Sequence, residues 1–582
     1  MGRLLYFCRL FYIYISDCVV IKINRLQKYF FNALIVASAS IIMHSISVSF
    51  NIFITGKIGS EAMGLVSLVS GVFGFGVTLA TSGINLAVVR LVSSALPYSE
   101  ELCRFDKKSS MHVRKIMTSA LFYCLFFSLL SSILLFILSR AIGDFILADQ
   151  RVIKSLRIMS FSFVPIAISS MLNGYFCAVR RVYKNVIVQF FEQGVKIFAT
   201  SSLLMLFAPH NIEYACICIA LGGLISELGS VSLNVILYFF DRNIHQKKKD
   251  DKEIIFSILS KNLGYVSEKP QKVPFFKRVK FFLKDTFKSR NNGVFSIAFP
   301  VAISAYVRSL LSTVENLAIP WGLKRSGLNS SMALSSYGVL CGFVFPLIFF
   351  PSSVLGAFAS LLVPEISSSY EAKDFSRIRY ITKRVFSFSL LFSLCVSGIF
   401  ICFSNEIGVY FFKSNEAAEL IKLLSPLIPL MYLDSAVDAI LKGIGEQIYS
   451  MRVNIIDSFL SVILIIILLP KFGIYGYVLV IFITELLNTS LSIIRLLSKT
   501  GLKVEIRKWI VKPIISIILS TIITRLLFDF VFGGLSLYLK TEAIIKVVVC
   551  VTIYFVLINL FGAVSKSEYL LVKRAFAKEP GR

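Results

Sequence analysis

Long apolar segments separated by short polar ones dominate the chain. Runs of about twenty mostly apolar residues, enough to cross the hydrocarbon core of a bilayer as an α-helix, recur throughout the sequence. They fall at 30–55, 64–96, 117–138, 158–178, 186–207, 214–240, 293–318, 334–363, 385–403, 421–441, 454–469, 475–497, 511–532 and 543–561. This pattern predicts an all-α polytopic membrane protein of about fourteen transmembrane helices.

The order of the segments predicts the domain organisation. Six spans at 30–240 form an N-terminal lobe, and six at 293–497 form a C-terminal lobe. A basic cytoplasmic linker, 241–292, joins the lobes, and 498–582 holds two further helices and a cytoplasmic tail. Residues 1–29 are apolar but interrupted by charges, without a small-residue cleavage site, and we expect a cytoplasmic or interfacial segment.

A short internal repeat supports two pseudo-symmetric lobes. Gly174 and Gly443 are 269 positions apart, and so are Asn185 and Asn454, with six predicted spans between the two occurrences. Transporters built from two such halves bind substrate between them, near the middle of the bilayer. We therefore expect a binding site at the interface of the lobes.

The formal net charge of +28 arises from Lys and Arg residues that lie mainly in alternate gaps between the spans. This bias is typical of cytoplasmic loops, so both termini are predicted to be cytoplasmic and nucleic acid is not the expected partner. In the linker, Phe275, Val279 and Phe282 recur at helical spacing between lysines. That stretch is either an amphipathic helix on the anionic lipids of the inner leaflet or an ordinary solvated linker.

Motifs of soluble catalysis are missing from the sequence. It contains no GxxxxGK[ST] motif, no CxxC pair and no cluster of Cys and His, and its 11 cysteines and 4 histidines are scattered. We therefore expect no cofactor, no metal and no enzymatic activity. Transport would then draw on an ion gradient, the membrane potential or substrate turnover elsewhere.

Polar residues inside the first two spans form stripes. His44, Ser47, Asn51 and Thr55 share one face of the first predicted helix. Thr78, Ser82 and Asn85 share a face of the second, with Arg90 about one turn beyond. Such stripes line a water-filled cavity, or pack helices together through small and hydroxyl residues.

Three blocks of sequence resemble the stage V sporulation protein B group, in the polysaccharide-exporter branch of the multidrug/oligosaccharidyl-lipid/polysaccharide exporter superfamily. The first runs from 57 to 65 and continues through 79–84 and 89–92. The second covers segments between 299 and 367, and the third runs from 443 to 452 and continues at 470–476. The resemblance implies a V-shaped bundle of two six-helix lobes plus two trailing helices, which moves lipid-linked sugars across the cytoplasmic membrane. In one respect the chain departs from the group, because His44, Asn51 and Gly56 stand where the first helix of relatives carries arginines.

The remaining charged residues within spans are further candidates, because an ionised side chain is costly in lipid. Arg90 and Arg308 are the cations expected to meet a pyrophosphate, although Arg90 could instead extend to the inner interface. Glu315 lies two turns from Arg308 and could neutralise it.

Three acidic residues are candidates for ion coupling. Asp434 and Asp438 are four positions apart on one predicted helix and should face water or share a proton. Glu192 is the third, although its spacing to Lys196 favours a structural salt bridge.

Four functions remain open on the sequence, and one of them is a scaffold that has lost transport, which only the missing arginines of the first helix favour. The resemblance favours a flippase for a polyprenyl-pyrophosphate-linked oligosaccharide or a peptidoglycan precursor, working by alternating access as a monomer. A cation-coupled multidrug exporter of the same superfamily is the alternative. A membrane-bound glycosyltransferase or polymerase fits less well, because the predicted outer loops are short.

Overall fold

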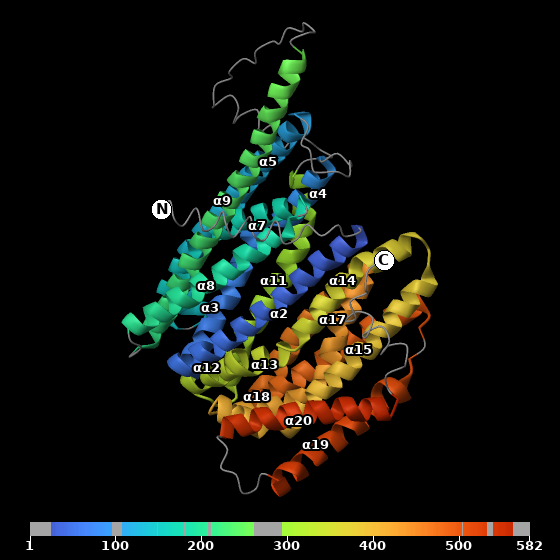
Figure 1. Cartoon of the computed structure of the whole chain (residues 1–582). Coiled ribbons are helices and arrows are strands. Elements are labelled where there is room, and N and C mark those ends of the chain that lie inside the picture. The colour runs from blue at the N-terminus through green and yellow to red at the C-terminus, as the bar shows by residue number, and fades with distance from the viewer. Residues whose placement is uncertain are drawn as a thin grey trace.

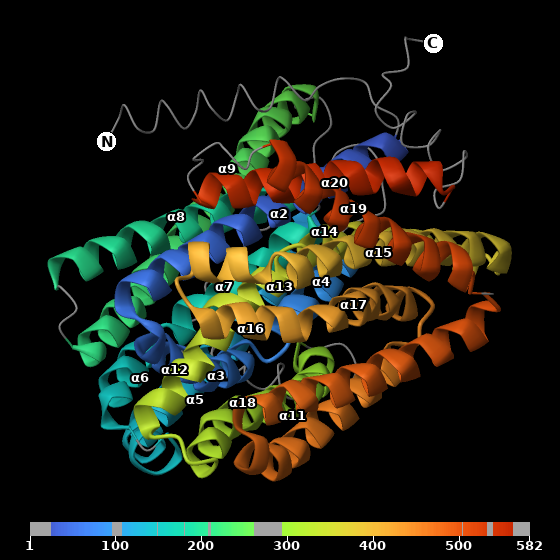
Figure 2. The same cartoon turned by 90° about the horizontal axis from the view of Figure 1, so that it is seen from below.

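The computed structural model describes residues 25–95, 107–147, 149–179, 181–207, 211–260, 294–502, 504–531 and 539–562. These residues form helices and short connections, without a β-strand. Figure 1 shows two bundles side by side, one from the first half of the chain and one from the second, and Figure 2 shows them turned by 90°. The predicted all-α membrane fold is confirmed.

The first half consists of α2 (Arg25–Ile58), α3 (Ser60–Thr81), α4 (Ile84–Ala95), α5 (Lys107–Ala141), α6 (Ile153–Ser160), α7 (Phe163–Ala178), α8 (Val182–Leu206) and α9 (Ile212–Ser260). The second half consists of α11 (Val294–Arg325), α12 (Ser330–Val339), α13 (Phe345–Phe349), α14 (Ser352–Glu371), α15 (Phe375–Cys402), α16 (Asn415–Leu424), α17 (Ile428–Gly443) and α18 (Gln447–Thr500). Two final helices, α19 (Lys512–Val531) and α20 (Leu539–Leu560), contact each other and α15.

Length and composition identify 10 helices able to cross a membrane in the described part of the chain, or 11 when the bent pair α6–α7 counts as one span. The predicted number of about fourteen is higher for two reasons. Helix α18 continues through two predicted spans, and α8 and α11 are not among the helices counted. Both of these helices carry charged residues in mid-helix, Glu192 and Lys196 in α8 and Arg308 and Glu315 in α11.

Glycines with positive φ mark the breaks in two long spans. The predicted span 64–96 is divided between α3 and α4, where Ser82 and Gly83 have φ of 42° and 69°. Helix α18 bends sharply at Gly473, whose φ of 57° and ψ of −136° are non-helical, three residues after Pro470. Proline removes a backbone donor and glycine tolerates positive φ, so this sequence favours a turn between two predicted spans.

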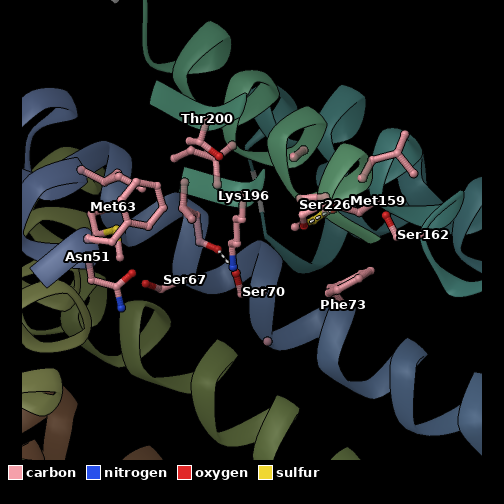
Figure 3. Close-up of a pocket in the computed structure, with 18 of the residues that line it drawn as sticks. Asn51, Met63, Ser67, Ser70, Phe73, Met159, Ser162, Lys196, Thr200 and Ser226 are labelled. Atoms are coloured by element: carbon pink, nitrogen blue, oxygen red, sulfur yellow. Dashed lines mark hydrogen bonds between the residues drawn. The ribbon is translucent and has the colours of Figure 1, made fainter. Parts of the chain in front are cut away.

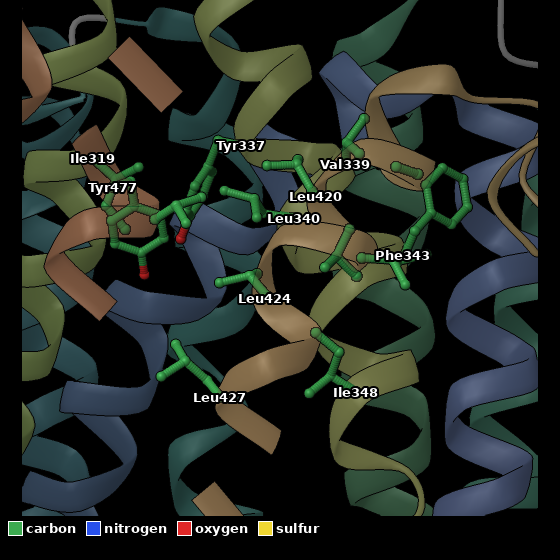
Figure 4. Close-up of a cluster of buried hydrophobic side chains, with 14 of the residues drawn as sticks. Ile319, Tyr337, Val339, Leu340, Phe343, Ile348, Leu420, Leu424, Leu427 and Tyr477 are labelled. Atoms are coloured by element: carbon green, nitrogen blue, oxygen red, sulfur yellow. The ribbon is translucent and has the colours of Figure 1, made fainter. Parts of the chain in front are cut away.

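The largest apolar cluster lies where the two halves meet. It joins Leu65 and Leu68 of α3 to Leu334 and Tyr337 of α12, and it continues into α16, α17 and α18. Figure 4 shows part of it, with Tyr337 and Leu424 among the buried side chains. Small residues allow close approach here, because a Cβ added to Gly64 would lie 2.1 Å from the carbonyl oxygen of Leu334.

The two glycines of the sequence repeat occupy matching places in the two halves. Gly174 of α7 packs against α4, where an added Cβ would lie 2.8 Å from the Asn85 carbonyl oxygen. Gly443 of α17 packs against α14, where an added Cβ would lie 2.8 Å from Ile366. In each half, therefore, the repeated glycine lets the fourth predicted span approach the second.

Ion pairs connect the last long helix of each half, α9 or α18, to the turn that precedes a helix of the same half. Asp241 of α9, only 1% exposed, pairs with Arg181 at 2.6 Å and with the buried Lys184 at the start of α8. In the second half, Glu446 pairs with Arg495 at 2.9 Å and Lys499 at 2.8 Å near the end of α18. These two cations lower the pKa of the Glu446 carboxyl, so the pairing persists at neutral pH.

Some predicted segments lie partly or wholly outside the described residues. Helix α9 continues past Asp241 to Ser260, so the predicted linker 241–292 begins as helix. The amphipathic stretch at 275–284 and most of the predicted segment 1–29 are outside the described ranges.

Replacing Gly338 by alanine should weaken the contact between the halves and destabilise the protein. Its added Cβ would lie 1.8 Å from the backbone oxygen of Ser60, which cannot move without shifting α3. We expect the free energy of unfolding to fall by about 1–3 kcal/mol. Thermal unfolding in detergent measures it, with Gly74→Ala as control, because a Cβ at Gly74 meets nothing within 4 Å. Equal midpoints for the two variants would contradict the prediction.

Candidate functional site

A cavity of about 540 Å³ lies between helices of the first half and the facing helices of the second. Helices α2, α3, α8 and α9 provide most of its lining, and α11 and α12 provide Asn316 and Tyr337. Asn316 and Tyr337 also contact each other through a hydrogen bond of 3.4 Å. The lining therefore comes mainly from the first half and is completed by the second, and a binding site at the interface of the lobes stays a prediction.

Three charged side chains line the cavity, and all come from α8 and α9. Glu192 and Lys196 lie one turn apart on α8, and Glu227 lies on α9. Lys196 interacts electrostatically with both carboxylates, and the two carboxylates also interact with each other. Glu192 additionally accepts a hydrogen bond of 2.8 Å from Ser230. Among the described residues, the lining of the cavity thus combines one cation with two acids.

Uncharged polar groups and aromatic rings complete the lining. Amides come from Asn51, Gln193 and Asn316, and hydroxyls from Ser67 and Ser70. Figure 3 shows Lys196 extending from α8 toward Ser70 of α3, with Ser67 and Asn51 beside it. The rings of Phe50, Phe73 and Tyr337 form apolar parts of the wall. Such a surface offers donors, acceptors and flat apolar faces within one space.

Two of the residues predicted for the site line this cavity, Asn51 and Glu192. The others lie elsewhere: His44, Asn85, Arg90 and Arg308 are exposed on their helices, and Glu315 accepts a hydrogen bond of 2.6 Å from Ser461 of α18. Sequence reasoning missed Glu227 and Asn316. A charge in the middle of the predicted span 214–240 was the signal for Glu227, because such residues tend to face cavities.

The predicted coupling residues Asp434 and Asp438 belong to an acidic group in the second half. Asp434 interacts electrostatically with Asp438, and with Asp457 and Glu485 of α18. Asp438 accepts a hydrogen bond of 2.6 Å from Ser450 and lies 3.9 Å from Lys442. This group is separate from the residues that line the cavity.

Helix α3 bonds to the second half on both sides of the cavity. At its start, the Ser60 hydroxyl lies 2.6 Å from that of Ser335, and Glu61 accepts a hydrogen bond from Ser331 at 2.5 Å. Arg151 also pairs with Glu61 at 3.2 Å.

Toward the other end of α3, the Thr78 hydroxyl donates to Ser309 of α11 at 3.1 Å, and Ser82 bonds to Tyr306. Thr78 and Ser82 therefore hold helices together here, as the packing alternative for the polar stripe predicts.

Comparisons with known proteins agree with this architecture. Residues 30–268 match the family model described as Polysaccharide biosynthesis protein, and 307–467 match the model MatE. Stage V sporulation protein B of Bacillus subtilis (strain 168) is 23% identical over 544 residues, which are 93% of this chain and 97% of the relative.

Two solved structures share the fold. The lipid II flippase MurJ, in an inward closed conformation, aligns with a TM-score of 0.60 at 14% identity, over 91% of this chain and 99% of that one. An inward-facing multidrug resistance MATE family transporter aligns with a TM-score of 0.56 at 12% identity, over 79% of this chain and 95% of that one.

The two family models, which match different halves of the chain, and the relative that aligns over 93% of it bear out the resemblance to the multidrug/oligosaccharidyl-lipid/polysaccharide exporter superfamily found in the sequence. Together with the helical membrane fold, they indicate a multi-pass membrane transporter.

The Lys196–Glu227 interaction should be measurable as a coupling energy. Lys196→Met leaves two facing carboxylates without their cation, so we expect lower thermal stability at neutral pH, and Glu227→Gln in the same chain should restore part of it. A double-mutant cycle on the purified protein should give a coupling of at least about 0.5 kcal/mol. Lys422→Met, on the exposed face of α16, serves as control. Additive effects of the Lys196 and Glu227 substitutions would refute the interaction.

Proposed function

We propose that this chain moves a lipid-linked sugar across the cytoplasmic membrane by alternating access. The observation that carries the proposal is the cavity between the halves, whose amides, hydroxyls, carboxylates and aromatic rings surround one ammonium group. Two comparisons support it: one family model is described as Polysaccharide biosynthesis protein, and one solved structure with the same fold is a lipid II flippase.

The lining suits a sugar attached to a phosphate. Sugar hydroxyls both donate and accept hydrogen bonds, so they can bind Glu227, Asn51 and Asn316 at once, while a ring such as Phe73 covers an apolar sugar face. A phosphate needs a cation, and Lys196 provides one as a compact point charge. Glu192 and Glu227 compete with the phosphate for the ammonium group of Lys196. Binding of the phosphate therefore requires Lys196 to move away from these two carboxylates.

Arg90 and Arg308 remain candidates for a different stage of transport. Arg90 lies on α4 and Arg308 lies on α11, and these two helices contact each other. Helix α4 follows the C-terminal end of α3, where Ser82 is located. Separation of the halves on that side would place both guanidinium groups along the path to the cavity. We propose that they attract the pyrophosphate before Lys196 binds it. Glu315, His44 and Asn85 have no assigned step in this scheme.

The contacts of α3 suit a protein that opens on either side. Hydrogen bonds between membrane helices contribute about 1 kcal/mol each, so the few bonds on each side of the cavity can break in turn. The bonds of Ser60 and Glu61 would part in one state, and those of Thr78 and Ser82 in the other. The basic gaps between spans favour a cytoplasmic location for both termini, which places the Ser60 end of α3 on the outer side.

A cation-coupled exporter is the second candidate. Two carboxylates in the cavity, Glu192 and Glu227, and the separate acidic group around Asp434 favour it, because such groups can bind a cation or take up a proton. The same acidic group could also couple sugar transport to an ion gradient.

Reconstitution into proteoliposomes tests the proposal. The probe is a fluorescent undecaprenyl-pyrophosphate-linked disaccharide, whose arrival in the opposite leaflet is measured with a membrane-impermeant quencher. We expect the wild type to move it, Lys196→Ala to slow it at least tenfold, and Lys196→Arg and Lys422→Ala to retain most of the rate. Export of cationic dyes against a sodium or proton gradient, without movement of the lipid, would instead establish the second candidate.

A further inference from the structure

A second hollow, of about 500 Å³, lies on the outside of the first half, between α2 and α8. Ser45, Ser49 and Phe53 of α2 and Ile197 and Ser201 of α8 line it. The hollow exists because serines occupy positions on a surface whose other residues are bulky, such as Phe198, which is 76% exposed. The Ser45 hydroxyl donates to the Ile41 carbonyl at 2.9 Å, so its polar group is satisfied within the helix and can face lipid.

This α2–α8 groove and the polar cavity adjoin each other through a single side chain. Phe50, which is 7% exposed, lines both spaces. Residues that are adjacent in α8 face different spaces. Lys196 and Thr200 line the cavity, whereas Ile197 and Ser201 line the groove. Helices α2 and α8 therefore separate the polar space from the lipid-facing one, and Phe50 is the residue that borders both.

The sizes and chemistry of the two spaces match the two parts of an amphiphile. A cavity of about 540 Å³ has the volume of a site for a drug-sized ligand, so it can hold a sugar head group but not a long lipid chain as well. The chain has to remain in an apolar environment while the head is inside. The groove provides that environment at the level of the cavity, because both spaces include residues of the same turns of α2 and α8.

Resting on the proposed function, we propose that the polyprenyl chain of the substrate lies in the α2–α8 groove while its head group occupies the cavity, with Phe50 as the gate between them. Rotation of the Phe50 side chain joins the two spaces without separating the halves. The lipid is therefore held at a lateral opening within the first half, and the interface with the second half stays free to open and close.

Site-specific photocrosslinking tests the groove. Benzoylphenylalanine is placed at Ser49 or Ser201 in the groove, or at Phe126 of α5, a lipid-exposed control position that is 60% exposed. Each variant is reconstituted with the labelled undecaprenyl-pyrophosphate-linked disaccharide and irradiated. We expect at least fivefold more labelling at the groove positions than at Phe126. Excess unlabelled substrate should reduce the labelling in the groove, whereas excess phosphatidylglycerol should not.

Substitutions at Phe50 provide a second measurement on the same samples. Phe50→Trp, which enlarges the gate, should slow flipping about tenfold, whereas Phe126→Trp should leave the rate unchanged. Flipping by the wild type, with labelling no greater in the groove than at Phe126, overturns the groove proposal and leaves the proposed function standing. Absence of both flipping and competed labelling overturns the two together.

Discussion

The cost of placing charged groups within a bilayer constrains the whole arrangement. Glu192 and Lys196 lie in the middle of α8, and Glu227 lies in the middle of the candidate membrane span of α9. An unpaired charge that faces lipid costs several kcal/mol. They are tolerated because α8 and α9 turn them toward one another and toward a polar space. The cavity is thus a condition for these helices to span the membrane as well as the candidate site of transport.

The same constraint explains the role of α3. This helix faces the cavity with Ser67 and Ser70, and on either side it bonds to the second half through hydroxyl groups. Glycines at 64 and 338 bring the backbones close, so the contact depends on shape as much as on polarity. The contact between α3 and the second half is closely packed, but no single hydrogen bond accounts for most of its stability. That combination is what a transporter with two exclusive openings requires.

The sequence was sufficient for the fold class, because hydropathy determines which segments cross a membrane, and its three resembling blocks pointed to the superfamily; the binding site between the lobes remains a prediction. It also identified Asn51 and Glu192 as candidates. It could not decide which way each helix faces: Thr78 and Ser82 lie on a predicted polar stripe, but they contact α11 instead of lining the cavity. The rotation of a helix depends on its neighbours, and for the same reason the placement of Glu227 and Lys196 around one cavity only became visible in three dimensions.

The central claim is that a sugar head group occupies the cavity between the halves. A structure of the protein in lipid nanodiscs with an undecaprenyl-pyrophosphate-linked disaccharide tests it most directly. The account predicts density for the head group between Lys196 of α8 and Asn316 of α11, with a phosphate beside the ammonium group. Head-group density confined to the acidic group around Asp434, with the cavity empty, would contradict it.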